Sequence, residues 1–449
     1  MKVIIVGGVA GGASCAARLR RLDEKAEILM VERGPYVSYA NCGLPYHISG
    51  VIPQESNLLV ANEQVFRGLY GIDVRTSCEA IAIDPKKKTV DLKNVETGEV
   101  TTESYDKLVL SPGAASVHPP LPGIDLPGIF HVRTVPDART IREWVAGGTD
   151  FLAGMSKYAG IQYVKPTTRA VVIGGGFIGL ETAENLVHLG FEVTLLQKLP
   201  QLLGPLDHEV ARLVEEHVKR NGVNVVLNDG AAGFAPLDGG AIEVTTQSGK
   251  TYPADIVILA IGVRPDTALA KMAGLEIGER GGIRVDDQMR TSDPDIFAVG
   301  DAIEVKDFVT GQWNLVALAG PANRQGRIAA DVIAGRDSRY RGTQGTAIIG
   351  LFDGAAAWTG VSEKTLKRIG DEDYEKIFIF PNSHAGYYPG AKMIGLKVIF
   401  RKSDGRLLGA QALGQDGPAV DKRISALAVA IQMGATIYDL EESELCYAP

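Results

Sequence analysis

The chain has 449 residues, 45% of them hydrophobic and 22% charged, a composition typical of a globular protein and not of a disordered one. Its length suits roughly three domains of ~150 residues each. The net charge of −8 argues against a surface for nucleic acid or anionic membrane, and no apolar run reaches the ~18 residues that span a bilayer. We therefore expect a cytoplasmic, multi-domain protein whose partners are small molecules.

Residues 2–32 have the pattern of a βαβ motif: a strand over 2–8, a glycine turn, a helix over 13–22 and a strand over 26–32. The GxGxxG spacing is incomplete, because Val9 stands at the middle glycine position. The helix N-terminus would face a pyrophosphate, and the acidic residue ending the second strand would bind the ribose hydroxyls of an adenosine. The pattern predicts a dinucleotide site made of Gly7, Gly8, Gly11, Gly12, Glu32 and Arg33.

Residues 37–47 (VSYANCGLPYH) follow this motif and contain a candidate redox cysteine, Cys42. Asn41 and Gly43 would shape a turn that places Cys42 at the start of a helix, where unpaired N–H groups favour the thiolate. No cysteine follows within five residues, so an internal dithiol cannot form there. The partner sulfur must come from the substrate, or Cys42 must be oxidised to a sulfenic acid. We interpret His47 as a loop residue.

The remaining cysteines have neither CxxC pairing nor zinc-like spacing, so the sequence indicates no disulfide framework and no metal site. We interpret them as structural residues: Cys15, Cys78 and Cys446.

A second βαβ motif begins at Arg169, with a strand over 170–176, a helix over 177–190 and a strand over 192–197. Its GxGxxG spacing is complete, and the site residues it predicts are Gly174, Gly176, Gly179 and, on the helix, Glu181. Two such motifs imply two nucleotide ligands. Residues 146–165, which lead into the second motif, have no clear periodicity and no functional interpretation.

The ribose-reading position of the second motif holds Gln197, followed by Lys198, where NADH-selective proteins usually carry an acidic residue. A neutral amide beside a cation does not repel a 2′-phosphate. Both NADH and NADPH therefore stay open as electron donors.

Residues 291–301 (TSDPDIFAVGD) match a second flavin fingerprint, in which a strand ends in Gly300 and Asp301 and the carboxylate accepts hydrogen bonds from the ribityl chain. This segment assigns FAD to the first motif and leaves NAD(P)H for the second. Asn323 and Arg324 are expected to begin a helix that stabilises the negative charge of a reduced flavin. The expected cofactor-binding residues also include Gly113 and Gly262.

From about Gly342 the character changes to strands at 345–353, 392–401 and 406–414 and a helix over 421–434. The chain as a whole thus predicts an α/β protein with two Rossmann-like dinucleotide-binding domains plus a C-terminal α+β dimerisation domain. The expected boundaries are 1–118 and 253–325 for a discontinuous FAD-binding domain, 119–252 for an NAD(P)H-binding domain and 326–449 for the dimerisation domain.

Eight motifs spread over the chain resemble one family: GGVAGGAS, SYANCGLPYHISG, VVIGGGFIGLE, IGVRPDT, TSDPDIFAVGD, LAGPANRQGR, SHAGYYPG and ELCYAP. The family is the single-cysteine branch of the pyridine nucleotide–disulfide oxidoreductases, and the resemblance is strongest to its coenzyme A disulfide reductases and CoA-persulfide reductases. The resemblance implies an FAD enzyme in which NAD(P)H supplies electrons and Cys42 forms a mixed disulfide with coenzyme A.

Further roles rest on the resemblance alone. Tyr387 and Tyr447 of one subunit of a homodimer would reach the cysteine region of the other and donate hydrogen bonds to the sulfur substrate. Many relatives continue past the CYAP segment into a rhodanese domain, so we expect either a truncated or minimal form or a separate sulfur donor. The phosphates of coenzyme A would be held by Arg18, Arg20 and Arg21.

Two other functions stay open. An NADH oxidase or peroxidase of the same branch would cycle Cys42 through a sulfenic acid. A redox-sensing protein would use FAD as a structural ligand and regulate a partner. Turnover of NAD(P)H with CoA disulfide, but not with peroxide or oxygen, would separate the three.

Overall fold

The computed structural model describes residues 1–147 and 168–446. The chain forms two compact units, each made of several segments. Unit 1 consists of residues 1–41, 54–115 and 263–343, and unit 2 of residues 42–53, 116–262 and 344–449. Unit 2 thus contains most of the regions expected for the NAD(P)H-binding and dimerisation domains. The boundaries between the three expected domains are not tested by this division and remain a prediction.

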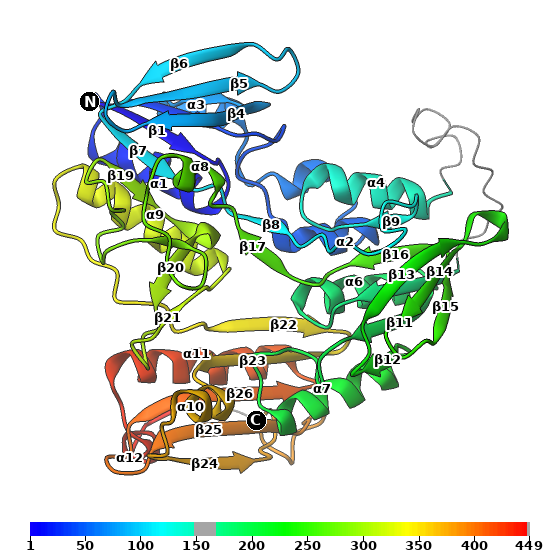
Figure 1. Cartoon of the computed structure of the whole chain (residues 1–449). Helices are drawn as coiled ribbons and strands as arrows, with labels where there is room; N and C mark the ends of the chain where they lie inside the picture. Colours follow the sequence, from blue (N-terminus) through cyan, green and yellow to red (C-terminus); the bar gives the residue numbers. More distant parts are fainter. Residues whose placement is uncertain (148–167, 447–449) are drawn as a thin grey trace. The chain divides into compact units, whose positions relative to one another are not determined.

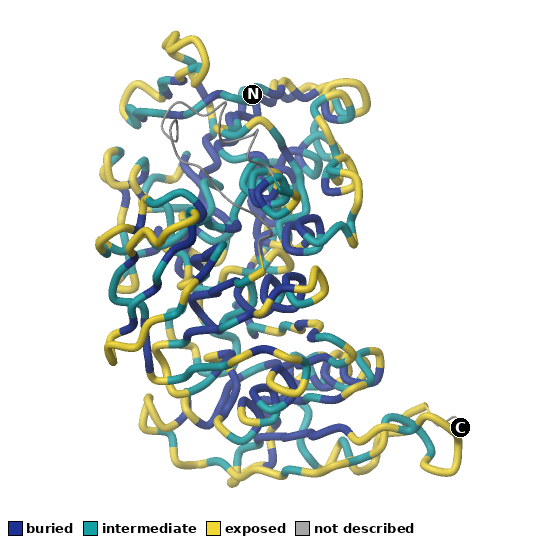
Figure 2. The backbone as a smooth tube through the Cα atoms, turned by 90° about the vertical axis from the view of Figure 1, so that its right-hand side faces the viewer, coloured by how far each residue is buried: buried dark blue, intermediate teal, exposed yellow. Residues whose placement is uncertain are grey.

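Unit 1 is built around a parallel sheet of five strands in the order β19-β7-β1-β2-β3 (Figure 1). The central strands read KVIIV and EILMV, and nearly all of their side chains are buried, as is usual for parallel strands covered on both faces. In Figure 2 the buried parts of the backbone are dark blue and the exposed parts yellow. The strands are β1 (Lys2–Val6), β2 (Glu27–Val31), β3 (Asp73–Arg75), β7 (Lys107–Leu110) and β19 (Ile296–Ala298).

Two smaller sheets, β4-β5-β6 and β18-β20-β21, and the strands β8 and β17 complete the β structure described in unit 1. Their bounds are β4 (Cys78–Asp84), β5 (Thr89–Asn94), β6 (Val100–Ser104), β8 (Ala114–Ser116), β17 (Val263–Pro265), β18 (Ile283–Arg284), β20 (Ile303–Lys306) and β21 (Trp313–Asn314). The α-helices are α1 (Ala10–Leu22), α3 (Glu63–Tyr70), α8 (Ala268–Met272) and α9 (Ala319–Ile333).

Helices α1 and α9 lie side by side in unit 1 because glycines allow their backbones to approach (Figure 1). A Cβ atom on Gly326 would lie 2.2 Å from the carbonyl oxygen of Gly11. No residue with a side chain fits at that distance. The contact holds the start of α1, where the first glycine turn lies, against α9.

Unit 2 contains a second parallel sheet, in the order β12-β11-β10-β16-β9, and a small antiparallel sheet β13-β14-β15. The strands are β9 (Ile129–Phe130), β10 (Arg169–Ile173), β11 (Glu192–Gln197), β12 (Asn224–Leu227), β13 (Ala231–Pro236), β14 (Ile242–Thr246), β15 (Thr251–Ala254) and β16 (Ile256–Leu259). The helices of this part are α2 (Leu44–Ile48), α4 (Val135–Val145), α6 (Phe177–His188) and α7 (His208–Arg220).

The rest of unit 2 is an antiparallel sheet in the order β22-β23-β26-β25-β24, with α11 packed on β23 and β26 (Figure 1). Helix α11 begins at Gly417, four residues earlier than predicted, because Asp416 caps it by accepting from the N–H of Ala419. The strands and helices of this part of unit 2 are β22 (Ala347–Leu351), β23 (Gly354–Gly360), α10 (Glu363–Ile369), β24 (Tyr374–Ile379), β25 (Ile394–Arg401), β26 (Leu407–Gly414), α11 (Gly417–Met433) and α12 (Ile437–Glu441).

A buried lysine joins this antiparallel sheet to α7. Lys397 on β25 has no exposed side-chain surface, and its Nζ lies 2.8 Å from Asp207, 2.6 Å from Glu209 and 2.6 Å from Glu363. Asp207 is the N-cap residue of α7, and Glu363 is the first residue of α10. One cation therefore fixes two helix starts against the sheet.

Candidate functional site

The glycine turn after β1 closes tightly around the start of α1. Gly7 has φ of 95°, and a Cβ atom on Gly12 would lie 1.8 Å from the carbonyl oxygen of Gly7. Helix α1 has no side-chain cap and no acidic residue in its first turn. No acidic residue in the helix's own first turn therefore offsets the positive end of its dipole, which fits the pyrophosphate of a dinucleotide.

Glu32 lies beside this turn, as the sequence predicted. Its Oε2 accepts a hydrogen bond from the N–H of Gly8 at 2.9 Å, and its Oε1 accepts from the N–H of Gly34 at 2.8 Å. A carboxylate has further lone pairs, so an oriented Glu32 can still accept from ribose hydroxyls. The neighbouring Arg33 is largely exposed and lies near carboxylates of unit 1, 3.6 Å from Glu79; its role in cofactor binding stays a prediction.

The second flavin segment contains the predicted strand, but this strand ends before Gly300 and Asp301 and does not include them. Strand β19 stops at Ala298, and a 3-10 turn over Gly300–Ala302 presents Gly300, with φ of 80°, and Asp301. The N–H of Gly300 donates to Oε1 of Gln325 at 2.8 Å. Gln325 is buried on α9 and was missed in the sequence, because its contact lies 25 residues away.

The helix expected to begin at Asn323 and Arg324 begins at Ala319, so that prediction was wrong. Pro321 lies in the first turn of α9, where the missing N–H breaks no helical hydrogen bond. Asn323 lies one turn inside the helix and accepts from the hydroxyl of Ser14 on α1 at 3.0 Å. It therefore helps to join the two helices.

In unit 2, the three glycines of the second motif separate into two kinds. Gly174 has φ of 112°, and a Cβ atom on Gly179 would lie 1.9 Å from the carbonyl oxygen of Gly174, so both are required by the backbone itself. A Cβ atom on Gly176, the N-cap residue of α6, would meet nothing within 4 Å. Gly176 thus borders open space at a helix N-terminus without a side-chain cap, which suits a pyrophosphate.

The residues around this glycine turn lie as the βαβ pattern requires. Gln197 is the last residue of β11, and its Nε2 donates to the carbonyl oxygen of Gln201 at 3.2 Å, while Lys198 is exposed. Gly262 has φ of 112°, and Gly113, in unit 1, has φ of 72°. Both glycines adopt conformations that side chains disfavour, and whether they contact a cofactor stays a prediction.

Two acidic side chains on α6 are poorly solvated. Burial, and secondarily the charge of Glu184, raises the pKa of Glu181 to about 7. Burial also raises the pKa of Glu184, whose Oε2 has no hydrogen-bond partner among the described residues. Burial and then the charges of Glu181, Glu184 and Cys42 raise the pKa of Tyr46 on α2. Glu184 and Tyr46 were missed, although the three-residue spacing of the glutamates places them on one helix face.

Cys42 is exposed and lies in a 3-10 turn, Asn41–Gly43, immediately before α2, as expected from the sequence. Helix α2 packs against α4 and α6, and the hydroxyl of Ser49 donates to Oδ1 of Asn185 on α6 at 2.5 Å. The interpretation of His47 as a loop residue was wrong. It is a buried residue of α2, with Nδ1 2.8 Å from the carbonyl oxygen of Ile52.

The other three cysteines differ from one another. Cys15 and Cys78 are buried in the core of unit 1, which confirms the predicted structural role. Cys446 is exposed, so the same interpretation was wrong for it. All residues from 441 to 446 are exposed, whereas a structural cysteine would be packed against neighbours.

The residues assigned to the substrate have different surroundings. Tyr387 is 73% exposed in unit 2, and Tyr447 lies outside the described residues. Arg18 forms an ion pair with Asp331 at 2.8 Å. Arg20 donates to the carbonyl oxygens of Tyr70, Glu24, Asp23 and Gly71, which is a structural role, and Arg21 is exposed.

Within the described ranges, no group of three or more histidine, cysteine or acidic side chains is arranged to hold a metal ion. The helices described between residues 1 and 446 also include none long and apolar enough to cross a membrane.

Comparison with known proteins identifies both parts of the chain. Residues 1–326 match the pyridine nucleotide-disulphide oxidoreductase model, and residues 346–449 match the dimerisation domain of the same family. A coenzyme A disulfide reductase of Staphylococcus epidermidis is 33% identical over 100% of this chain and 96% of its own length. An NADH oxidase of Methanocaldococcus jannaschii is also 33% identical, over 100% of this chain and 95% of its own length.

Two solved structures are more similar in sequence. The reduced CoADR-RHD of Bacillus anthracis is 47% identical, with a TM-score of 0.93 over 100% of this chain and 77% of its own. An NAD-dependent persulfide reductase from A. fulgidus is 39% identical, with a TM-score of 0.92 over 100% of this chain and 80% of its own. The predicted α/β fold with a C-terminal dimerisation domain is confirmed. The chain belongs to the pyridine nucleotide-disulphide oxidoreductases, NAD(P)H-dependent flavoprotein enzymes that use FAD.

Proposed function

We propose that this enzyme uses NAD(P)H and FAD to reduce a disulfide or persulfide of coenzyme A at Cys42. The observation that carries the proposal is the exposed thiol of Cys42 before α2, with no second cysteine near it in the chain. Because this segment of the chain contains a single cysteine, Cys42 can form a mixed disulfide only with a sulfur from elsewhere, such as that of a substrate. The names of the relatives with the highest identity given above agree with coenzyme A or persulfide chemistry.

The chemistry balances with one thiol. The Cys42 thiolate attacks one sulfur of CoA disulfide; the S–S bond breaks, one CoA leaves as a thiol after taking a proton, and Cys42 keeps the other in a mixed disulfide. FAD held by Glu32, the start of α1 and Asp301 would supply the two electrons, taken from NAD(P)H, that cleave this mixed disulfide. The second CoA thiol then leaves and Cys42 returns to the thiolate. With a persulfide, the outer sulfur leaves as sulfide.

Both nucleotide sites have the features that these cofactors need. Glu32 and the uncapped start of α1 would hold the adenosine and pyrophosphate of FAD, and Asp301 would bind its ribityl chain. Gly176 and the start of α6 would hold the pyrophosphate of NAD(P)H. Gln197 would face the ribose of that second cofactor.

The match of the C-terminal part to a dimerisation domain supports a proposal about the assembly. We propose a cytoplasmic homodimer in which Tyr387 and Tyr447 of one subunit bind the sulfur substrate at Cys42 of the other, since Tyr387 is exposed in the single chain. Arg18 and Arg21 would bind the phosphates of coenzyme A more readily than Arg20, because the guanidinium of Arg20 already donates hydrogen bonds to carbonyl oxygens. A rhodanese-type protein would be a separate sulfur donor.

The test is Cys42→Ser compared with Cys446→Ser, which removes the other exposed thiol. Cys42→Ser should lose turnover with CoA disulfide and CoA persulfide by several orders of magnitude, because a serine hydroxyl is not ionised at neutral pH and forms no disulfide. Flavin reduction by NAD(P)H should stay near the wild-type rate in both variants. Wild-type turnover of CoA disulfide by Cys42→Ser would overturn the proposal.

The rival function, an NADH oxidase or peroxidase with a Cys42 sulfenic acid, is also supported by a relative of that name. Steady-state rates with CoA disulfide, peroxide and oxygen separate the two. If oxygen or peroxide is turned over far faster than CoA disulfide at equal NAD(P)H, the rival is correct.

The electron donor is tested at Gln197. We propose that NADPH is accepted, because Gln197 and the exposed Lys198 bring no negative charge to the ribose. Gln197→Glu should raise the ratio of kcat/KM for NADH over NADPH by roughly tenfold or more. An unchanged ratio would show that residue 197 does not contact the ribose.

A further inference from the structure

Two histidines of unit 2, neither of them assigned to a cofactor or a substrate, face each other. Nδ1 of His118 lies 3.2 Å from Nε2 of His131, and the two rings are tilted by 47° with their centroids 5.5 Å apart. His131 directly follows β9, the edge strand of the parallel sheet, and His118 lies in the segment before that strand. The fold thus brings together two imidazole nitrogens from residues that are 13 positions apart in the chain.

The distance between these two nitrogens matches the spacing of two ligands on one tetrahedral metal ion. Zinc binds histidine nitrogen at about 2.0 to 2.1 Å in tetrahedral geometry, so two such nitrogens lie about 3.3 Å apart. Two nitrogens at right angles on a square-planar or octahedral ion would lie about 2.9 Å apart at the same bond length. The observed separation of 3.2 Å therefore fits zinc better.

The surroundings of the two rings favour the facing nitrogens as ligands. Nε2 of His118 lies 3.5 Å from Oδ1 of Asp125, which favours the proton at Nε2 and a lone pair at Nδ1. Metal-binding histidines usually have such a partner at the second ring nitrogen. Nδ1 of His131 is buried, so Nε2 is the nitrogen of that ring that a ligand can reach.

A hydrated ion can reach the pair from solvent. The side chain of His118 is 50% exposed, and the exposed carboxylate of Asp125 adds a negative charge beside it. Two imidazoles fill two of the four positions of a tetrahedral ion, and water molecules would fill the others. The pair therefore differs from a site with three or more protein ligands, which the described part of the chain does not contain.

We propose that His118 and His131 bind a zinc ion at the edge of the parallel sheet of unit 2, with Asp125 orienting His118. The ion would tie the segment before β9 to the sheet and so stabilise the folded unit. The site uses no residue expected to bind FAD, NAD(P)H or coenzyme A. It does not depend on the proposed reaction at Cys42.

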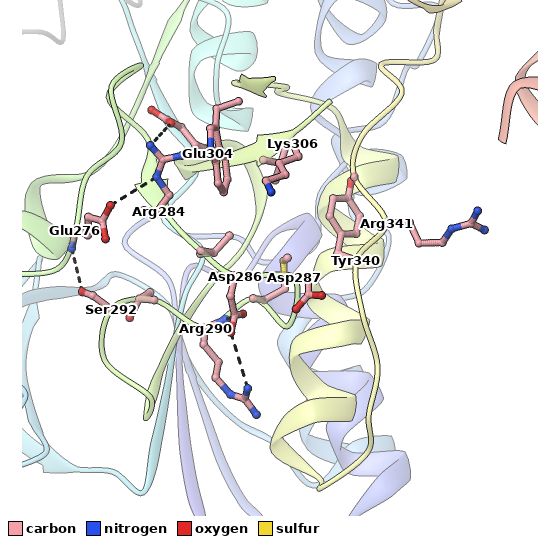
Figure 3. A pocket seen from close by; sticks show the side chains of 16 residues that line it. Glu276, Arg284, Asp286, Asp287, Arg290, Ser292, Glu304, Lys306, Tyr340 and Arg341 are labelled. Carbon is pink, nitrogen blue, oxygen red and sulfur yellow. Dashed lines mark hydrogen bonds and ion pairs between the residues drawn. The ribbon is translucent and has the colours of Figure 1, made fainter. Parts of the chain in front are cut away.

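Two other kinds of side chain can bind zinc and need controls. The exposed thiols of Cys42 and Cys446 are zinc ligands, so the experiment uses the flavoprotein with Cys42→Ser and Cys446→Ser as its background. Carboxylates are the second kind, and Figure 3 shows Asp286 and Asp287 at the wall of a pocket of about 560 Å³ in unit 1. Because oxygen ligands suit Mg²⁺, an excess of Mg²⁺ competes for carboxylates but not for imidazole nitrogens.

The experiment is calorimetric titration of this background protein with zinc chloride in excess Mg²⁺. One saturable zinc site per chain is expected. His118→Gln and His131→Gln should each weaken zinc binding roughly tenfold or more, because each removes one of two nitrogen ligands, and loss of an outer partner alone costs about 10- to 100-fold. His208→Gln, which removes an exposed histidine at the first position of α7, is the matched control and should leave the affinity unchanged.

Thermal unfolding gives a second measurement. Saturating zinc should raise the Tm of the background protein, because a ligand that binds the folded state stabilises it, and His118→Gln should lose this shift. His118 is half exposed, so its replacement should leave the Tm without zinc unchanged. Absence of saturable zinc binding, equal affinity in the background protein and His118→Gln, or an equal loss in His208→Gln would overturn the proposal.

Discussion

Replacing Lys397 with methionine should destabilise unit 2 by about 3 to 5 kcal/mol, the range seen when one partner of a buried ion pair is removed. Its Nζ contacts three carboxylates at 2.6 to 2.8 Å, and two of these, on Asp207 and Glu363, are themselves buried. Methionine fills a similar volume, so the loss comes from the charge and not from a cavity. Asp207 keeps a hydrogen bond from Gln411 at 2.8 Å, which keeps the expected effect within this range.

The control is Lys376→Met. Nζ of Lys376 also contacts Glu363, at 2.7 Å, but its side chain is 48% exposed. Exposed ion pairs contribute about 0 to 1 kcal/mol, so this variant should be nearly as stable as the wild type. Urea unfolding followed by tryptophan fluorescence, in which Trp358 on β23 reports on unit 2, measures the difference. Equal losses in both variants would refute the argument that burial of the Lys397 charge sets the magnitude.

The same cluster gives a dependence on pH. Burial alone would raise the pKa of Glu363, but hydrogen bonds from Lys376 and Lys397 outweigh it and lower the pKa from 4.5 to about 2. A carboxyl group with a lowered pKa contributes its full stability above the unfolded value and loses it on protonation. The wild type should therefore lose this contribution as the pH falls from about 4.5 to about 2. In Lys397→Met this loss should be smaller, because without Lys397 the pKa of Glu363 in the folded state lies closer to its unfolded value.

Three further predictions concern the site in unit 2. Because burial raises the pKa of Glu181 from 4.5 to about 7, the stability of the wild type should fall as the pH rises through that interval. Thermal unfolding curves of Glu181→Gln should show a smaller fall, and what remains comes in part from Glu184, whose pKa burial also raises. Gly179→Ala should lower the free energy of unfolding by about 1 to 3 kcal/mol, the usual cost of overpacking, because its Cβ atom would meet the backbone of Gly174. Gly176→Ala should leave the stability unchanged and weaken NAD(P)H binding, since its Cβ atom would meet open space. Equal losses of stability in the two variants would refute this distinction. Tyr387→Phe should slow reduction of the sulfur substrate and leave flavin reduction and stability unchanged, and Tyr388→Phe is its control, since both tyrosines are exposed; loss in both half-reactions would indicate a structural role.

The sequence was informative where the determinants are local. A strand of apolar residues, a glycine turn and a helix lie within about 30 residues, so the two βαβ motifs and the positions of Glu32 and Gln197 could be predicted from spacing alone. The turn that presents Asp301 was predictable for the same reason.

The sequence was uninformative where the determinants are contacts between distant segments. Nothing near Gln325 indicates that it accepts from the N–H of Gly300, and nothing near Lys397 indicates three carboxylate partners from α7 and α10. His47 was misread because the flanking residues resemble a loop, while its burial arises from packing of α2 on α4 and α6. The start of α9 was placed too late: the helix already includes Gly320 and Pro321, and proline is well tolerated in a first helical turn.

Two helices that contact each other, α2 and α6, carry the proposed redox cysteine and the glycine turn expected to hold NAD(P)H. The cysteine lies directly before α2, which is tied to α6 by the hydrogen bond from Ser49, and α6 begins at the glycine turn expected to hold NAD(P)H. The acidic group of α6 with the largest shift, Glu181, has a pKa of about 7. Below that pH it is mostly protonated, so it adds less negative charge to the region in which the proposed Cys42 thiolate would form than an ordinary glutamate would. Burial of this glutamate thus favours the thiolate form of Cys42, which the proposed attack on a disulfide would need.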